Sequence, residues 1–248
     1  MKDAIGNADM KQGQLGGVIF TADRFGNLNE ALNINTGYTY VDPGYYFTTP
    51  QFSISLWVYQ DAVSASNLNS LIDFGNSNNY VANNDIILNT NSFSPALQIW
   101  NYNSLIVYVQ SPANIFSYLQ WIHLVATYDG VTANIYLNGS LVSSVKQSYS
   151  LPVLIRSSNY FGKYYLYPNN YYFGNTFLDD IRFYSISLTP NQILNIMNIP
   201  ASCPVSTYTT AVQPSYTGNS FTYSNSFVPI RLQLSNVKSE RYPTFSFR

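Results

Sequence analysis

Carboxylates are the side chains with the most chemical options in this sequence, because they serve both glycosidases and calcium sites. The chain has 248 residues with 12 Asp and Glu, and only Glu30 and Glu240 are glutamates. A glycosidase needs two carboxyl groups about 5–10 Å apart on one face of a site. Asp179 and Asp180 are adjacent in a predicted strand, so we expect their side chains to leave on opposite faces. The carboxylates therefore indicate a protein that is not a glycosidase.

His123 is the single histidine and hence the one candidate for an imidazole base. It lies in an alternating run whose other members on the same face are Trp121, Val125 and Thr127. This pattern predicts a partly buried strand histidine with one hydrogen bond, and not a catalytic group. We therefore expect a protein without enzyme activity.

Tyrosine is the residue type that best fits a binding function. Residues 160–173 contain six Tyr and two Phe, and the Pro and Asn among them predict a loop. Tyr offers a flat apolar ring with a polar tip at low entropic cost, which suits sugar stacking and protein contacts. The candidate ligand-binding residues are Tyr164, Tyr165, Tyr167, Asn169 and Tyr171. The alternative is that these rings only cover the edge of the fold.

A second aromatic cluster is open to the same two interpretations. It comprises Tyr38, Tyr40, Tyr45, Tyr46 and Phe47.

Charge excludes several classes of partner. Only 9% of the residues are charged, where a soluble domain carries roughly 25%, and the net charge is −1. No basic stripe is present to neutralise phosphates or anionic lipids, so nucleic acid is not an expected partner. No apolar run approaches the roughly 18 residues of a membrane span, so no membrane insertion is expected. Cys203 is the single cysteine, which forbids an internal disulfide.

Short alternating or apolar runs, separated by Gly, Pro and Asn, predict an all-β fold. Residues 52–58 alternate Phe, Ile, Leu and Val with polar or aromatic residues, as expected for a strand with one buried face. Residues 121–128, 133–137 and 140–146 predict a meander with turns at Asp129-Gly130 and Asn138-Gly139. Further strands are predicted at residues 17–22, 30–35, 38–41, 69–74, 84–90, 96–101, 104–109, 155–162 and 176–186. About a dozen strands should form two packed antiparallel sheets.

One short helix is predicted near the end of the strand-rich region, at residues 190–198. Thr189 is its expected N-cap, Pro190 its first residue, and Ile193, Leu194 and Met197 its buried stripe. From residue 201 the sequence is rich in Ser, Thr, Pro and Tyr. We therefore predict a domain at residues 1–200, followed at 201–248 by a linker or the truncated start of a further segment.

Six sequence blocks in this order resemble a laminin G-like domain of the concanavalin A-like lectin/glucanase superfamily, over roughly residues 4–199. They are residues 23–27 (DRFGN), 52–58 (FSISLWV), 121–130 (WIHLVATYDG), 135–139 (IYLNG), 161–163 (FGK) and 178–184 (LDDIRFY). The resemblance implies a jelly roll of two antiparallel sheets with one short C-terminal helix. It also implies an extracellular setting, and glycan or protein binding rather than catalysis.

The resemblance further implies one calcium ion between the N-terminal loop and the last strand. These segments map to Asp9 and to Asp179 or Asp180, which become neighbours if the first and last strands pair. The alternative is that Asp180 pairs with Arg182 and Asp9 is a solvated loop residue.

Together these observations predict a non-catalytic recognition or adhesion module for a carbohydrate or an extracellular protein. The resemblance implies a place outside the cell or on its surface. Because the first twenty residues lack the apolar segment of a signal peptide, we expect the chain to reach that place as part of a longer one. Two alternatives remain open: a purely structural repeat of a large surface protein, and an accessory binding domain of a hydrolase.

Overall fold

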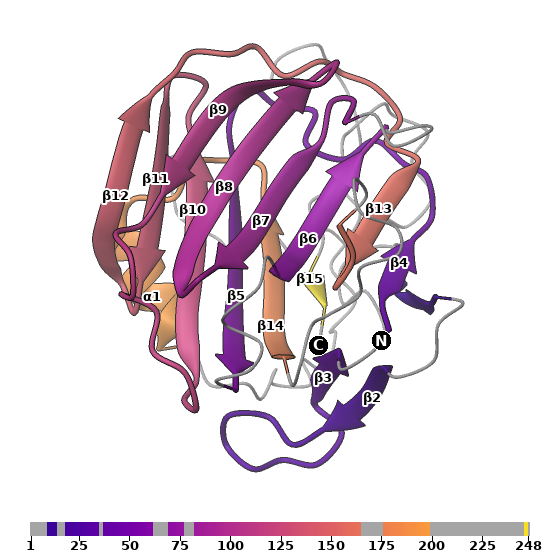
Figure 1. Cartoon of the computed structure of the whole chain (residues 1–248), viewed down its shortest axis with the longest axis vertical. Coiled ribbons are helices and arrows are strands. Elements are labelled where there is room, and N and C mark those ends of the chain that lie inside the picture. Colours follow the sequence, from indigo (N-terminus) through magenta and orange to yellow (C-terminus); the bar gives the residue numbers. More distant parts are fainter. Residues whose placement is uncertain are drawn as a thin grey trace, which may run out of the picture.

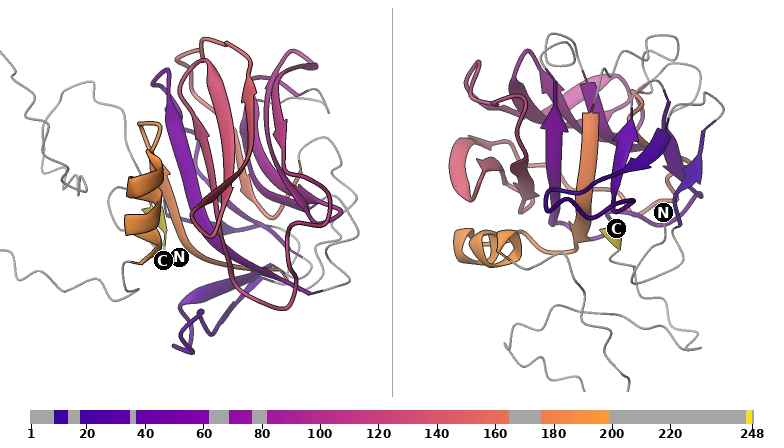
Figure 2. Two further views of the ribbon diagram at one scale, coloured as in Figure 1. Left: turned by 90° about the vertical axis from the view of Figure 1, so that its left-hand side faces the viewer. Right: turned by 90° about the horizontal axis from the view of Figure 1, so that it is seen from below.

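Two antiparallel sheets pack face to face, as the number of predicted strands requires (Figure 1, Figure 2). They are seen in a computed structural model that describes residues 9–13, 18–34, 37–61, 69–76, 82–164, 176–198 and 246–247. Every strand pair is antiparallel, and strands distant in sequence are neighbours in both sheets. The all-β jelly-roll prediction is confirmed.

The seven-stranded sheet has the order β1-β4-β13-β6-β7-β8-β9. Its strands are β1 (Lys11–Gln12), β4 (Thr39–Val41), β13 (Ser158–Phe161), β6 (Asn69–Gly75), β7 (Ile86–Asn91), β8 (Ser94–Asn101) and β9 (Ser104–Gln110). The eight-stranded sheet has the order β12-β11-β10-β5-β14-β3-β2, with β15 paired to β14. Its strands are β12 (Ser140–Lys146), β11 (Thr132–Leu137), β10 (Ile122–Tyr128), β5 (Phe52–Gln60), β14 (Thr176–Tyr184), β3 (Ala31–Ile34), β2 (Val18–Thr21) and β15 (Ser246–Phe247).

The core lies between the sheets and is built by alternation along the strands. In β5 the inward residues Phe52, Ile54, Leu56 and Val58 are at most 1% exposed. Burying an aliphatic or aromatic side chain of this size contributes about 1.5–3 kcal/mol, so this one face supplies a large share of the driving force. The outward side chains of β5 form part of the outer face of the eight-stranded sheet.

The predicted meander is present as β10, β11 and β12. Leu137 pairs with Ser140 across the tight turn, where Asn138 and Gly139 both have positive φ, 47° and 79°. Such a turn needs residues that tolerate left-handed backbone, which is why Asn-Gly occurs here.

Helix α1 (Pro190–Met197) begins as predicted and covers one end of the outer face of the eight-stranded sheet. Thr189 is the N-cap in a capping box with Gln192. Ile193 and Ile196 pack with Val125 and other buried residues of that face. The prediction for Leu194 was wrong: it is 41% exposed, because the i, i+3 pair of isoleucines faces the sheet.

None of the helices in the described ranges is long and apolar enough to cross a membrane. The predicted linker lies mostly outside the described residues, which include only Ser246 and Phe247 of that region. These two residues pair with Arg182 and Ile181 of β14.

Candidate functional site

A pocket of about 350 Å³ opens at the β1 edge of the seven-stranded sheet, and we name it the edge pocket. This volume lies near the lower end of small-molecule sites, roughly 300–1,000 Å³, so there is room for a small ligand. Three tyrosines provide its aromatic surface and amide and hydroxyl groups its polar surface. The lining residues are Gln12, Gly13, Tyr38, Tyr40, Val41, Pro43, Ser157, Asn159 and Tyr160.

Strand register places two of the tyrosines side by side. Tyr40 of β4 is paired with Tyr160 of β13 on one side and with Lys11 of β1 on the other. Their strand neighbours Thr39, Val41 and Phe161 are buried, so alternation turns Tyr40 and Tyr160 to the outer face. Two distant segments therefore present adjacent aromatic rings.

Tyr38 completes the aromatic surface. Its ring meets the ring of Tyr160 edge to face, with centroids 5.5 Å apart. The Nζ atom of Lys163 lies 4.5 Å from the Tyr38 centroid and 4.4 Å from the Tyr160 centroid. Burial lowers the pKa of Lys163. This cation–π arrangement helps to fix both rings.

Gly13 makes the third tyrosine's position possible. Its N–H donates to the Tyr38 carbonyl at 2.8 Å, and a Cβ at this position would collide with the Tyr38 ring. Any side chain at position 13 would therefore have to displace one wall of the edge pocket.

A buried arginine anchors the other wall. Arg156 is fully buried, and its guanidinium donates to the carbonyls of Tyr46 and Asn84. Its backbone forms a two-way bridge with Gly44, beside the pocket residues Pro43 and Ser157. Burial lowers the pKa of Arg156 to about 10, so the group remains cationic at neutral pH. The wall is tied to the body of the sandwich.

The polar groups of the edge pocket are amides and a hydroxyl. The Asn159 amide donates to the carbonyls of Asp42 at 3.3 Å and Arg156 at 2.9 Å, and the Ser157 hydroxyl donates to Asn76 at 2.9 Å. The Gln12 side chain is exposed at the edge strand. Asn159 is 1% exposed and uses its NH2 group in these bonds, so Gln12 and Ser157 are the polar side chains of this set that can pair with hydroxyl groups.

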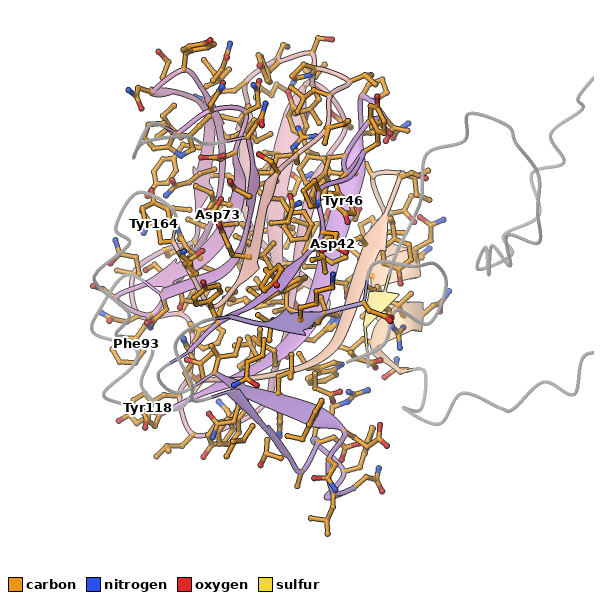
Figure 3. The ribbon with its side chains drawn as sticks, turned by 90° about the vertical axis from the view of Figure 1, so that its right-hand side faces the viewer. Asp42, Tyr46, Asp73, Phe93, Tyr118 and Tyr164 are labelled. Carbon is orange, nitrogen blue, oxygen red and sulfur yellow. The ribbon has the colours of Figure 1, made fainter. Side chains whose placement is uncertain are left out.

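Among the residues that the structure describes, no charged side chain is part of the edge-pocket lining. Lys11 and Asp42, which are sequence neighbours of lining residues, form an ion pair with Nζ and Oδ2 2.6 Å apart. Both side chains are about half exposed. Figure 3 labels Asp42 on this side of the molecule. The hydrogen bond to Asp42 raises the pKa of Lys11. These two charges compensate each other, and the Nζ of Lys163, over the rings of Tyr38 and Tyr160, is a further cation beside the pocket.

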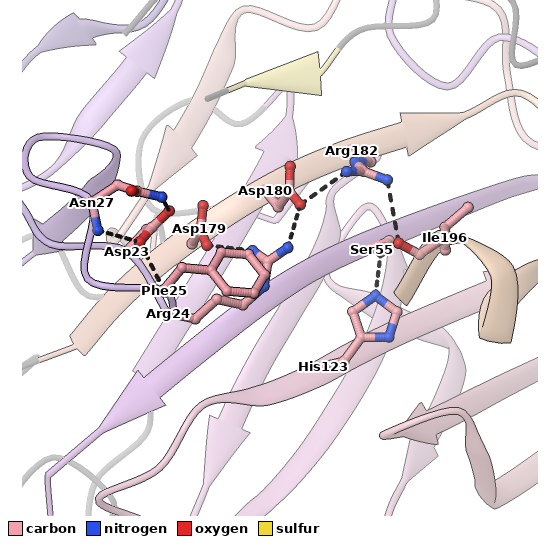
Figure 4. A network of polar contacts seen from close by, with 10 residues as sticks. All are labelled: Asp23, Arg24, Phe25, Asn27, Ser55, His123, Asp179, Asp180, Arg182 and Ile196. Atoms are coloured by element: carbon pink, nitrogen blue, oxygen red, sulfur yellow. Dashed lines mark hydrogen bonds and ion pairs between the residues drawn. The ribbon is translucent and has the colours of Figure 1, made fainter. Parts of the chain in front are cut away.

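A second polar cluster lies on the outer face of the eight-stranded sheet (Figure 4). The Arg24 guanidinium, from the loop between β2 and β3, donates to Asp179 and, at 2.9 Å, to Asp180. Arg182 also donates to Asp180 at 2.9 Å. The side chains of Arg24, Asp179 and Asp180 are only 4–5% exposed. These ion pairs are inside the protein and not on its solvated surface.

The expectation that Asp179 and Asp180 leave on opposite faces was wrong. The register with β5 shifts between Asp179 and Arg182, and Asp180 has φ 52°. Such a β-bulge adds a residue to one strand and re-aims its side chain. Both carboxylates therefore reach the same guanidinium.

The two aspartates do not fit a calcium ion. Calcium requires six to eight oxygen ligands, and here each carboxylate already binds a guanidinium. Asp9 precedes β1 in the other sheet, and the strands paired with β14 are β3, β5 and β15. The first and last strands of the sandwich therefore do not pair as the predicted site required. Among the residues that the structure describes, His, Cys, Asp and Glu form no group of three suited to a metal.

His123 matches its prediction as a buried strand residue. It is 2% exposed, and its Nε2 lies 2.9 Å from the Ser55 hydroxyl. Desolvation, helped by Arg182 and Arg24, lowers its pKa to about 3. A Ser–His pair without solvent access has no route to a substrate.

Of the predicted Tyr-loop residues, the described ranges include only Tyr164. Its side chain is 7% exposed, so its ring packs inside and offers no open face to a ligand. The other four residues, Tyr165, Tyr167, Asn169 and Tyr171, lie outside the described residues.

The edge pocket combines residues that the sequence singled out with residues that it did not. Tyr38 and Tyr40 belong to the second aromatic cluster and Tyr160 begins the Tyr-rich segment. Gln12, Ser157 and Asn159 belong to no sequence motif. Only the pairing of distant strands brings them to the same pocket, so the sequence analysis did not single them out. The available signal was alternation in the predicted strand at 155–162, which turns Tyr160 to the outer face.

The fold and its blocks identify the superfamily. Residues 33–194 match the family model Laminin_G_3, described as the concanavalin A-like lectin/glucanases superfamily, and the chain belongs to this family. No curated protein matches the chain.

Solved structures with the same fold include receptor-binding domains of botulinum neurotoxins. The domain of the C/D mosaic serotype has a TM-score of 0.59 and 13% identity, over 77% of this chain and 46% of that one. The binding domain of botulinum neurotoxin DC in complex with SialylT has a TM-score of 0.56 and 16% identity, over the same shares. The serotype C1 binding domain has a TM-score of 0.55 and 16% identity, over 77% and 47%. The chain thus spans about half the length of these domains and shares their lectin-like fold.

Proposed function

We propose that this chain is a non-catalytic recognition module that binds neutral carbohydrate in the edge pocket. The observation that carries the proposal is the combination of three tyrosine rings with amide and hydroxyl groups in one pocket, whose described lining residues include no charged side chain. The family and the likeness to toxin binding domains, one of them in complex with SialylT, support carbohydrate as the ligand class.

The chemistry of the lining suits a sugar. Tyrosine rings pack against the C–H faces of a pyranose while their hydroxyls remain available for hydrogen bonds. Gln12 and Ser157 offer further donors and acceptors to ring hydroxyls. A ligand that combines an apolar face with hydroxyl groups at its edge satisfies both parts of the pocket.

Neutral sugars are favoured over acidic ones by electrostatics. A sugar carboxylate binds best to arginine or lysine through charge-assisted hydrogen bonds. Neither is among the described lining residues of the edge pocket. Lys11 nearby is paired with Asp42, and the Nζ of Lys163 lies over the rings of Tyr38 and Tyr160. A buried carboxylate without a cationic partner would lose binding energy.

Absence of catalysis is part of the proposal, and it is supported by the interactions that occupy four of the aspartates. Asp179 and Asp180 bind Arg24, Asp42 binds Lys11, and Asp23 accepts three hydrogen bonds within its own loop. A glycosidase needs one of a carboxyl pair available as acid and the other as nucleophile or base. We place the module outside the cell or on its surface as part of a longer chain.

A glycan array with the purified chain tests this function. We expect binding to neutral glycans, weaker binding to their acidic counterparts, and loss of the signal in Tyr160→Ala. Tyr102→Ala is the matched control, because Tyr102 is 74% exposed at the β8–β9 turn and is not among the residues that line the pocket. An array without any bound glycan would contradict the proposal and favour a protein ligand or a structural role.

A further inference from the structure

Arg24 lies where the loop between β2 and β3 meets the middle of β14. Its two terminal nitrogens bind different carboxylates, Asp179 and Asp180. The planar fork of a guanidinium can span two acceptors in this way, which a lysine ammonium does less well. One side chain thus joins two segments separated by 155 positions.

The guanidinium also lies close to two aromatic rings. Its Cζ lies 4.5 Å from the centroid of Phe25 and 4.7 Å from that of Trp57. These ring contacts shield the group from water and strengthen its interaction with the carboxylates.

The loop is built to hold Arg24 in this place. Asp23 accepts hydrogen bonds from the backbone N–H groups of Phe25 and Asn27, both at 2.8 Å, and from the Asn27 amide at 2.9 Å. Gly26, with φ 87°, closes the turn. On the other side, the bulge at Asp180 turns both carboxylates toward the loop.

Charge is balanced within this cluster. Asp179 and Asp180 bring two negative charges, and Arg24 and Arg182 bring two positive ones. A divalent cation would have to displace Arg24 and would still lie close to Arg182. The residues are arranged for a guanidinium and not for a metal ion.

We infer that Arg24 acts as a built-in cation at this junction and fastens the β2–β3 loop to β14 without calcium. The domain then needs no calcium for its stability. This inference does not depend on the proposed function, because its test measures melting and uses no ligand.

The test compares melting temperatures of the full chain with about 1 mM CaCl₂ and with excess chelator. We expect the same melting temperature in both conditions. If the folded domain bound calcium, a calcium concentration of 100 times the Kd would raise the melting temperature by several degrees. Arg24→Gln should lower the melting temperature by roughly 6–20 °C, because it leaves two buried carboxylates with one arginine. Lys11→Gln, which breaks an exposed pair, is the matched control and should change it by at most about 4 °C.

Arg24→Lys gives a second readout if Arg24→Gln does not fold. It keeps the charge but not the fork, so its melting temperature should fall below that of the wild type. A calcium-dependent rise in the wild type that Asp180→Asn abolishes would overturn the inference. Wild-type melting of both Arg24 variants would overturn it as well.

Discussion

Asp179 and Asp180 are consecutive residues of one strand, yet both carboxylates accept hydrogen bonds from the same guanidinium. A regular strand would send them to opposite sides of the sheet. The bulge at Asp180 is therefore the feature that creates the ion-pair cluster on the outer face of the eight-stranded sheet.

The two aspartates should differ in their contribution to stability. Asp180 binds both Arg24 and Arg182, so Asp180→Asn leaves two buried cations short of a partner and should cost about 3–5 kcal/mol. Burial raises the pKa of Asp179 to about 6, against the opposing effect of Arg24, so its charged form is less favourable and Asp179→Asn should cost less. Urea unfolding at neutral pH measures both. An equal or larger loss of unfolding free energy in Asp179→Asn would show that the cluster depends on Asp179 at least as much as on Asp180.

The protein should lose stability on acidification because of His123. Its folded pKa of about 3 lies below the ordinary 6.5, so its contribution is complete above pH 6.5 and is lost as the pH falls toward 3. Asp179 works in the opposite direction: its contribution is complete below pH 3.8 and is lost as the pH rises through about 6. The change at His123 is the larger, so the net effect is destabilisation by acid.

His123→Gln is the variant that tests this pH dependence. Gln is neutral at every pH in the window and can still bind the Ser55 hydroxyl. Free energies of unfolding at about pH 4 and pH 7 should differ less in this variant than in the wild type. Asp179→Asn should instead steepen the loss. A His123→Gln protein as sensitive to acid as the wild type would assign the effect to another group.

Tyr164 should act on stability and not on ligand binding. Its ring is 7% exposed, and truncation of a buried aromatic costs about 3–5 kcal/mol. Thermal melting compares Tyr164→Ala with Tyr45→Ala, since Tyr45 is 48% exposed. We expect a lower melting temperature for Tyr164→Ala and little change for Tyr45→Ala. Unchanged melting of Tyr164→Ala would return Tyr164 to the list of candidate ligand contacts.

A chain ended at Asn198 should still unfold cooperatively. The described core strands and α1 all lie before residue 199, and β15 adds only two residues to β14. Circular dichroism during a thermal melt should show one transition at a temperature close to that of the full chain. Loss of that transition would mean that the C-terminal region is a required part of the sandwich.

Local patterns in the sequence were enough to predict much of the fold. Alternation fixes which face of β5 is buried, and Asn138-Gly139 has few alternatives to a tight hairpin turn. Thr189 and Pro190 mark the start of α1 for equally local reasons.

The site was harder to predict because it depends on pairing between distant strands. Gln12, Tyr40 and Tyr160 meet only because β1, β4 and β13 are neighbours, and no local signal gives that order. The bulge at Asp180 likewise follows from the register of β14 against β5, so the alternation rule failed there. Register and strand order are set by packing of the whole sandwich.

The most direct test of the central claim is calorimetric titration of the full chain with a neutral oligosaccharide selected on the glycan array. We expect saturable binding that weakens about tenfold or more in Tyr40→Ala and in Gln12→Ala, since each removes a contact from the edge pocket. Tyr118→Ala, an exposed tyrosine outside the pocket, should bind as the wild type does. Wild-type affinity in both pocket variants, with unchanged melting temperatures, would contradict the assignment of the edge pocket as the carbohydrate site.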